Sequence, residues 1–188
     1  MLLSKFATIS NILTMLRLIL APVVLFFLLK HNWYAAFIVV IVAFLSDLLD
    51  GLLARFFNEQ TEFGALLDPI ADKVFLTACI WGLVFIKHPL FSLPAWFFYL
   101  LLMRECIVVI GTTFLRLKSS LIKIEPTMFG KLSAAIQMIF IVWLFISYFL
   151  AWDCAFANQQ FMLVVVIVSL LSFVHYFFLG IRLLNASR

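Results

Sequence analysis

Runs of apolar residues, each about 20 residues long, recur along the whole of this 188-residue chain. A helix needs about 20 consecutive apolar residues to cross the hydrocarbon core of a bilayer. Six such runs are visible, at about residues 11–30, 33–55, 65–87, 94–116, 128–150 and 159–184. They are continuous rather than alternating, and only 12% of the residues are charged, which favours helices over a membrane barrel. The sequence therefore predicts an all-α polytopic membrane protein with six transmembrane helices.

The chain shows no linker rich in proline or glycine and no repeat of fixed period, so residues 1–188 are expected to form a single membrane domain. Its first residues, MLLSKFATIS, lack the small-residue cleavage site of a signal peptide and the composition of an organelle presequence. We expect this stretch to be retained and to be able to form a short interfacial helix. The apparent lack of a presequence favours a bacterial inner (plasma) membrane.

The basic residues predict which way the bundle is oriented. With six spans both termini share one side, and the basic residues on that side are Lys5, Arg55, Arg116, Lys118, Lys123, Lys131, Arg182 and Arg188. Lys30 and Lys87 lie on the other side. Because basic residues accumulate in cytoplasmic loops, both termini and the site described next are expected to face the cytoplasm.

Four aspartates lie within apolar surroundings near the predicted cytoplasmic ends of the second and third spans. Asp47 and Asp50 are three residues apart, and Asp68 and Asp72 are four apart, so each pair shares one face of its helix. A short turn, from about residue 56 to residue 64, separates the two pairs. We therefore expect the two helices to be antiparallel neighbours and the four carboxylates to converge on one site.

Ionised aspartates in a membrane need compensation. Each costs roughly 2.5–3.5 kcal/mol within a span, so four cost on the order of 10 kcal/mol together. Helix capping, or salt bridges with Arg17, Arg55 and Lys73, would be one solution. Four clustered acids repel one another unless a cation of higher charge lies between them, and carboxylate oxygens select Mg²⁺ or Mn²⁺. Two such ions are common at sites of displacement at phosphorus. The pattern therefore favours a metal site, with two ions.

The residues after Asp50 suit a phosphate-bearing ligand. Gly51 and Ala54 share the face of Asp47 and Asp50, and small side chains there would let a ligand approach the backbone. Packing between helices through small residues is the alternative. Arg55 could hold a diphosphate, or extend towards the membrane surface.

These residues form a recognisable motif. The stretch DLLDGLLAR (Asp47–Arg55) and, eight residues later, GALLDPIAD (Gly64–Asp72) match every defined position of D-x₂-D-G-x₂-A-R-x₈-G-x₃-D-x₃-D. The chain thus resembles the CDP-alcohol phosphatidyltransferases. Six spans, cytoplasmic termini and the length of the chain are also similar to the core architecture of that family.

The resemblance implies a role for each motif residue. The residues implied to bind the metal ions are Asp47, Asp50, Asp68 and Asp72, and Asp72 would also be the general base. The residues implied to bind the CDP-linked lipid are Gly51, Ala54, Arg55 and Thr14. An acceptor hydroxyl would attack the phosphorus that carries the diacylglycerol, and CMP would leave. The family also suggests a homodimer.

Buried basic residues bear on the acceptor alcohol. Arg17 and Arg104 lie at membrane depth, where arginines are costly and usually face a polar interior. Pairing of Arg104 with Glu105 is disfavoured, because neighbours in a helix point apart. Arg116 and Lys131 lie at the cytoplasmic mouth, although the positive-inside rule alone would place basic residues there. We expect Arg17, Arg104, Arg116 and Lys131 to bind an acceptor that carries a phosphate.

Two such acceptors remain, phosphatidylglycerol and glycerol 3-phosphate. The N-terminal pattern N-x-L-T-x₂-R-x₄-P (Asn11–Pro22) is similar to both cardiolipin synthases and phosphatidylglycerophosphate synthases. Thr112 stands where the latter carry arginine, and the segment GKLSAAIQ (Gly130–Gln137) lacks their second lysine and their threonine. Arg116 and the pair His175–Tyr176 resemble the cardiolipin synthase pattern. The sequence therefore favours phosphatidylglycerol, with glycerol 3-phosphate as the alternative.

An ion-coupled transporter is the competing class. Transporters usually place ion sites near the membrane midplane, beside broken helices. Here the aspartates cluster towards one face, with no matching acidic pair at the other. Release of CMP that depends on a divalent metal ion would distinguish the enzyme from the transporter.

Overall fold

The computed structural model describes the backbone of residues 9–57, 62–86, 92–118, 128–152 and 154–186. Side chains are described for residues 14–47, 70–86, 92–111, 128–152 and 154–180. The regular elements of this part of the chain are all helices, and it contains no strand. The helices are α2 (Ile9–Leu29), α3 (Trp33–Phe57), α4 (Glu62–Phe85), α5 (Ala95–Lys118), α6 (Met128–Phe149) and α7 (Ala155–Ala186).

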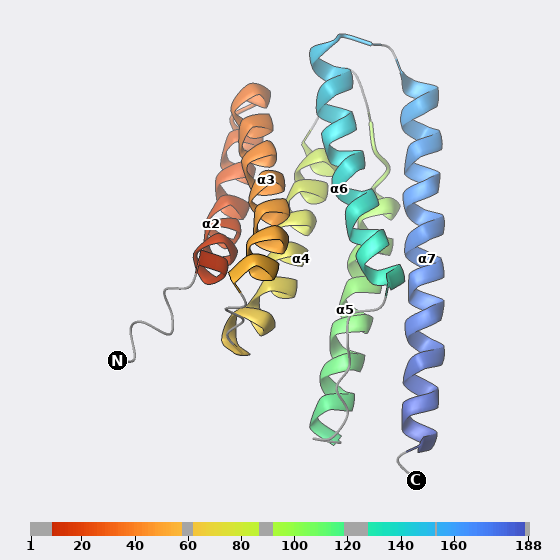
Figure 1. The fold of residues 1–188 in the computed structure, drawn as a ribbon. Helices are drawn as coiled ribbons and strands as arrows, with labels where there is room; N and C mark the ends of the chain where they lie inside the picture. Colours follow the sequence, from red (N-terminus) through yellow and green to blue (C-terminus); the bar gives the residue numbers. More distant parts are fainter. Residues whose placement is uncertain (1–8, 58–61, 87–91, 119–127, 153, 187–188) are drawn as a thin grey trace.

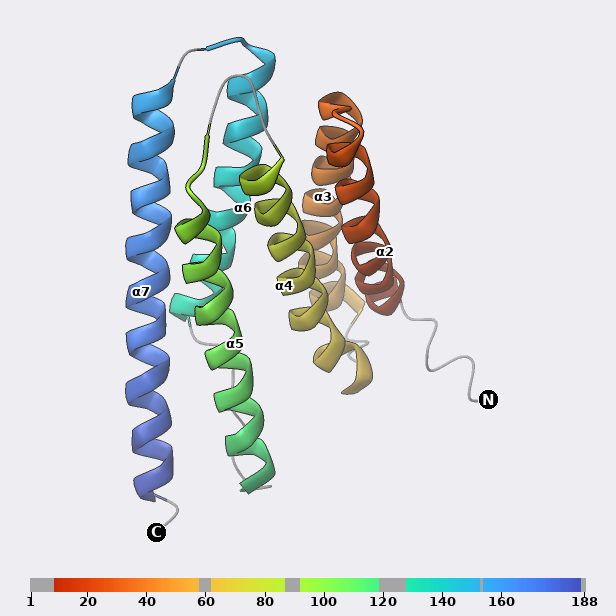
Figure 2. The same ribbon diagram turned by 180° about the vertical axis from the view of Figure 1, so that it is seen from behind.

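Successive helices run in alternating directions through the bundle (Figure 1). The first residue of α2 and the last residue of α7 consequently lie at the same end, as six spans require. Two views from opposite sides show α2, α3 and α4 grouped on one side and α5, α6 and α7 on the other (Figures 1 and 2). Helix α4 lies at the junction, where it packs against α2, α5 and α6.

The six predicted spans correspond to the six helices of the described residues, with ends that differ by a few residues. By length and composition alone, Met128–Phe149 and Ala155–Gly180 could cross a membrane, and Thr14–Leu29 and Trp33–Asp47 form shorter apolar stretches. The possible interfacial helix before Asn11 lies largely outside the described residues.

The outer surface of the bundle is apolar, unlike that of a water-soluble bundle. Large apolar side chains such as Ile110, Met103 and Phe156 are exposed on the outside of the helices. Arg17 and Gln137 are instead buried in the interior. Because apolar side chains gain nothing by leaving lipid, this arrangement suits a bundle surrounded by acyl chains.

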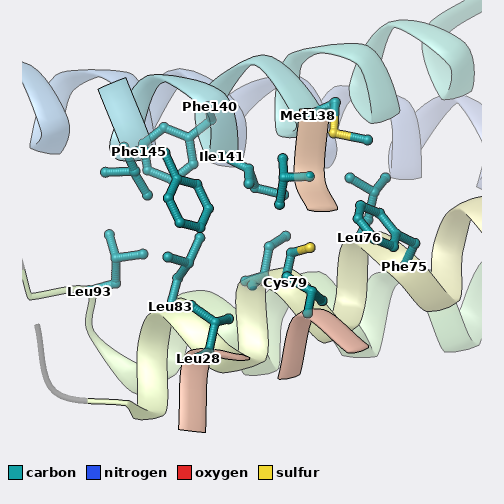
Figure 3. Close-up of a cluster of buried hydrophobic side chains, with 14 of the residues drawn as sticks. Leu28, Phe75, Leu76, Cys79, Leu83, Leu93, Met138, Phe140, Ile141 and Phe145 are labelled. Atoms are coloured by element: carbon teal, nitrogen blue, oxygen red, sulfur yellow. The ribbon is translucent and has the colours of Figure 1, made fainter. Parts of the chain in front are cut away.

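The apolar core lies where α4 meets α2 and α6 (Figure 3). Phe75, Cys79 and Leu83 recur at intervals of four residues along α4, so they project from one side of the helix. They pack with Leu28 of α2 and Ile141 of α6. This core fixes the position of α4, the helix that also carries two of the motif aspartates.

Gly82 allows α2 and α4 to approach closely, because a β-carbon there would collide with a side-chain methyl group of Leu28. We predict that Gly82→Val lowers the free energy of unfolding by about 1–3 kcal/mol through overpacking. Thermal unfolding of the detergent-purified protein would measure the loss. Gly111→Val is the matched control, since a β-carbon at Gly111 meets no atom within 4 Å. Equal losses in the two variants would contradict the prediction.

Candidate active site

A guanidinium group from α2 joins the two aspartate-bearing helices. Nη1 of Arg17 lies 3.0 Å from Oδ1 of Asp47 in α3 and also forms an ion pair with Oδ1 of Asp72 in α4. One nitrogen atom therefore contacts a carboxylate oxygen from each helix, which brings the two carboxylates side by side. The Arg17 side chain is only 1% exposed, whereas the carboxylates of Asp47 and Asp72 are 45% and 32% exposed. The site is thus open on the side of the carboxylates and closed behind the arginine.

The structure adds a third helix, α2, to the expected antiparallel pair of α3 and α4 (Figure 1). Among the described residues, α2 packs closely against both α3 and α4, and no packing of that extent occurs between α3 and α4 themselves. Arg17 supplies a positive charge between Asp47 and Asp72, whose carboxylates would otherwise repel one another. The connection between α3 and α4 is also shorter than expected, because α3 continues to Phe57 and α4 begins at Glu62.

The remaining two aspartates follow from helical spacing alone. Asp50 lies three residues after Asp47 in α3, and Asp68 lies four residues before Asp72 in α4. Their side chains lie outside the described residues, so convergence of all four carboxylates stays a prediction. The described side chains contain no group of three or more metal-ligating residues. Asp47 and Asp72 nevertheless offer adjacent, partly exposed carboxylate oxygens, the donor type that Mg²⁺ and Mn²⁺ prefer. The chemistry of these donors therefore fits the expected ions.

The residues predicted to hold the CDP-linked lipid lie beside this site. Thr14 is buried on α2 three residues before Arg17, so the two side chains share a face of that helix. Gly51, Ala54 and Arg55 belong to the last turns of α3, and nothing beyond their helical placement is described. Their binding roles stay predictions.

A second charged cluster lies on the neighbouring helix. Nζ of Lys73 in α4 is 3.0 Å from Oε2 of Glu105 in α5. Glu105 also forms an ion pair with Nη1 of Arg104, and Nη2 of that arginine donates a hydrogen bond of 2.6 Å to Oγ of Ser172 in α7. The predicted absence of an Arg104–Glu105 pair is therefore wrong. An arginine side chain is long enough to reach around the helix even though the two Cβ atoms point apart.

The other two predicted acceptor residues are less defined. Lys131 is exposed in the first turn of α6. Arg116 lies near the end of α5, and its side chain is outside the described residues. Neither is placed against Arg104, so a shared acceptor site for these residues stays a prediction.

Several buried polar residues were not anticipated from the sequence. Ser133 and Gln137 of α6 form hydrogen bonds with one another and with Ser169 of α7, at 3.2–3.4 Å. Ser172 lies three residues further along α7, on the same face. The available signal was the spacing: polar residues three or four apart within otherwise apolar spans indicate a face turned towards another helix.

A family model and the sequences of known proteins indicate the same family for this chain. Residues 7–177 match the family model described as CDP-alcohol phosphatidyltransferase. The chain is 37% identical over 123 residues to a CDP-diacylglycerol–glycerol-3-phosphate 3-phosphatidyltransferase of Aquifex aeolicus, an alignment that covers 65% of this chain and 67% of the relative. A probable phosphatidylglycerophosphate synthase of Mycobacterium tuberculosis is 36% identical over 143 residues, which cover 72% of this chain and 65% of that protein.

A second type of relative is more distant. A cardiolipin synthase (CMP-forming) of Rattus norvegicus is 28% identical over 150 residues, which cover 71% of this chain. The aligned region spans 48% of that protein. The chain therefore matches about two thirds of the length of the bacterial relatives and about half of the cardiolipin synthase.

The position of Arg17 predicts how the site responds to loss of its cation. Arg17→Met should lower the free energy of unfolding by about 1.5–3 kcal/mol, because a charged hydrogen bond is lost and the two carboxylates then repel. Added Mg²⁺ should recover part of the loss. Thermal unfolding in detergent, with and without Mg²⁺, measures both effects.

Arg17→Lys is the control, since it keeps the charge and should lose less stability than Arg17→Met. A methionine variant as stable as the wild type would show that the ion pairs do not hold α3 and α4 in place.

Proposed function

The chain belongs to the CDP-alcohol phosphatidyltransferase family of membrane enzymes, and we propose that it transfers the phosphatidyl group of CDP-diacylglycerol to an alcohol, with release of CMP. The observation that carries the proposal is the Arg17 bridge, because it joins the first and the last aspartate of the motif. Asp47 and Asp72 are 25 positions apart in the chain, yet they contact one nitrogen atom. This placement supports a single acidic centre in the role that the motif implies.

Divalent metal ions belong to the proposed chemistry. Two ions, either Mg²⁺ or Mn²⁺, would be held at the open side of the cluster by Asp47, Asp50, Asp68 and Asp72. When bound, such ions stabilise negative charge on the attacking and leaving oxygens at phosphorus. Arg17, behind the carboxylates, would keep Asp47 and Asp72 directed towards that side.

The protein's own residues would perform the proton transfer. Asp72 accepts the proton of the acceptor hydroxyl, and the oxygen attacks the phosphorus that bears the diacylglycerol. The bond from that phosphorus to the CMP oxygen breaks, which gives a phosphodiester and CMP. Gly51, Ala54, Arg55 and Thr14 would bind the CDP portion of the donor. A base must lie within hydrogen-bond reach of the hydroxyl, and the partial exposure of Asp72 leaves that access.

Glycerol 3-phosphate is the acceptor that we propose. The sequence motifs favoured phosphatidylglycerol, but the similarity over the aligned chain favours the other acceptor. The relatives named for glycerol 3-phosphate or phosphatidylglycerophosphate are 36% and 37% identical, against 28% for the cardiolipin synthase. Phosphatidylglycerol remains the second candidate because of Thr112 and the altered Gly130–Gln137 segment.

Arg104 supports an acceptor with a phosphate in either case. Its side chain is 7% exposed, and its buried Nε atom has no hydrogen-bond partner among the described residues. Lys73 and Arg104 share one carboxylate, Glu105, so this cluster keeps one positive charge. A buried donor with spare charge favours an anionic group. Arg17, Arg116 and Lys131 stay candidates for further acceptor contacts.

The setting of the enzyme is also part of the proposal. The excess of basic residues at the end that carries the motif supports a site on the cytoplasmic side of the plasma membrane. The family resemblance supports a homodimer, which size-exclusion chromatography with light scattering would measure.

Asp72→Asn should lower the turnover number by about 10²–10⁴-fold, the usual contribution of a general base. Binding of CDP-diacylglycerol should be largely kept, because the amide retains the size of the side chain and one acceptor oxygen, and the other three aspartates are unchanged. CMP release and calorimetric binding of the donor would be measured on the same preparation. Turnover close to that of the wild type would remove Asp72 from the role of base.

The acceptor is tested by offering CDP-diacylglycerol to the purified protein with each alcohol in turn. We expect glycerol 3-phosphate to give phosphatidylglycerophosphate, identified by mass, with kcat/KM at least about tenfold above that for phosphatidylglycerol. Excess chelator should abolish CMP release. Cardiolipin as the main product would establish the second candidate, and ion flux without CMP release would support a transporter.

A further inference from the structure

Helix α4 carries opposite charges at adjacent positions, and each charge is held by a different helix. Asp72 is paired with Arg17 of α2, and Lys73 is paired with Glu105 of α5. Adjacent residues of an α-helix are about 100° apart around its axis. The two ion pairs therefore contact α4 on two different sides.

Apolar packing alone would define the rotation of α4 less sharply. In a membrane, lipid chains are as apolar as the side chains of a neighbouring helix, so turning an apolar face towards lipid costs little. Ile70 and Val74 of α4 are already exposed on the outside of the bundle. The two ion pairs are directional, and rotation of α4 in either direction would break one of them.

Helix α5 is in turn fixed to the opposite side of the bundle. Arg104 connects the Glu105 carboxylate to Ser172, which is fully buried in α7. Two sets of polar contacts thus meet at α4: one joins Asp72 to α2 and α3, and the other joins Lys73 to α5 and α7. The Lys73–Glu105 pair is the link between the half of the bundle with α2 and α3 and the half with α7.

The partial burial of this charged link argues for a purpose beyond packing. The side chains of Lys73 and Glu105 are 32% and 16% exposed, and charges at membrane depth are costly to retain. Breaking one partner leaves the other charge without compensation. The pair is therefore an expensive way to join two helices unless the direction of a neighbouring group depends on it.

We propose that Lys73 and Glu105 are positioning residues that set the rotation of α4, and thereby the direction in which Asp72 presents its carboxylate. The inference rests on the proposed function for the role of Asp72. It assigns to Glu105 a part in the chemical step through α4, and no contact with either substrate.

Kinetics distinguish this role from acceptor binding. Glu105→Gln should lower kcat by about 10- to 100-fold, the cost of a small misplacement of a reacting group. KM for CDP-diacylglycerol should be unchanged, and KM for glycerol 3-phosphate unchanged or lower, because the variant removes a negative charge beside Arg104. A KM for glycerol 3-phosphate that rises while kcat is kept would overturn the proposal in favour of an acceptor contact.

A double-mutant cycle tests the pair itself. Lys73→Met should reproduce the loss in kcat, and Lys73→Met combined with Glu105→Gln should be no worse than either single change, because both remove one interaction. Lys73→Arg should restore most of the turnover. Ser147→Ala is the matched control: it removes a buried hydrogen bond of 2.9 Å to the carbonyl of Leu144, away from the charged clusters, and should leave kcat unchanged. Additive losses in the cycle, or an equal loss in the control, would overturn the proposal.

A measurement without substrate separates the inference from the proposed function. Calorimetric titration with Mn²⁺ alone should show weaker binding to Glu105→Gln than to the wild type, and unchanged binding to Ser147→Ala. If the wild type releases no CMP with either acceptor, the proposed function fails, and the titration still decides the role of Glu105. Equal Mn²⁺ affinity in Glu105→Gln and the wild type would show that the pair does not direct Asp72.

Discussion

The Arg17 guanidinium is the contact on which the rest of the site depends. A fully buried arginine in an apolar bundle needs anionic partners, and two carboxylates that face each other need a cation. Arg17, Asp47 and Asp72 satisfy both requirements at one point. Because the three residues come from three helices, the ion pairs add to the apolar packing of α2 against both α3 and α4. The electrostatics of the site and the packing of this half of the bundle therefore have one origin.

Much of the fold was predictable because it follows from the lengths and the number of the apolar runs in the sequence. The length of an apolar run sets the length of a helix, and an even number of spans places both termini of the chain on the same side of the membrane. The packing of α2 against both acidic helices was not predictable in the same way. The short connection between α3 and α4 requires them to be antiparallel, but it does not decide which third helix reaches between them. Arg17 indicates that α2 contacts both acidic helices only once its partners, Asp47 and Asp72, are known.

The acceptor illustrates a different limit of reading motifs. Thr112 and the Gly130–Gln137 segment depart from the pattern expected for a glycerol 3-phosphate site, and they favoured phosphatidylglycerol. Similarity over 123–143 aligned residues favours glycerol 3-phosphate instead. Ser133, which stands at the position of the missing second lysine, accepts a hydrogen bond from Gln137 and forms another with Ser169 in the described structure. A residue that belongs to a motif can thus be engaged in joining helices.

The two charged clusters divide the site by sign. Arg17 with Asp47 and Asp72 leaves one negative charge, whereas Glu105 with Lys73 and Arg104 leaves one positive charge. The boundary between them is the peptide bond that joins Asp72 to Lys73. A cation would be drawn to the side of α4 that carries Asp72, and an anionic group to the side that carries Lys73. Asp72, the proposed base, would then lie between the two bound groups. Helix α4 therefore presents opposite charges on two of its sides.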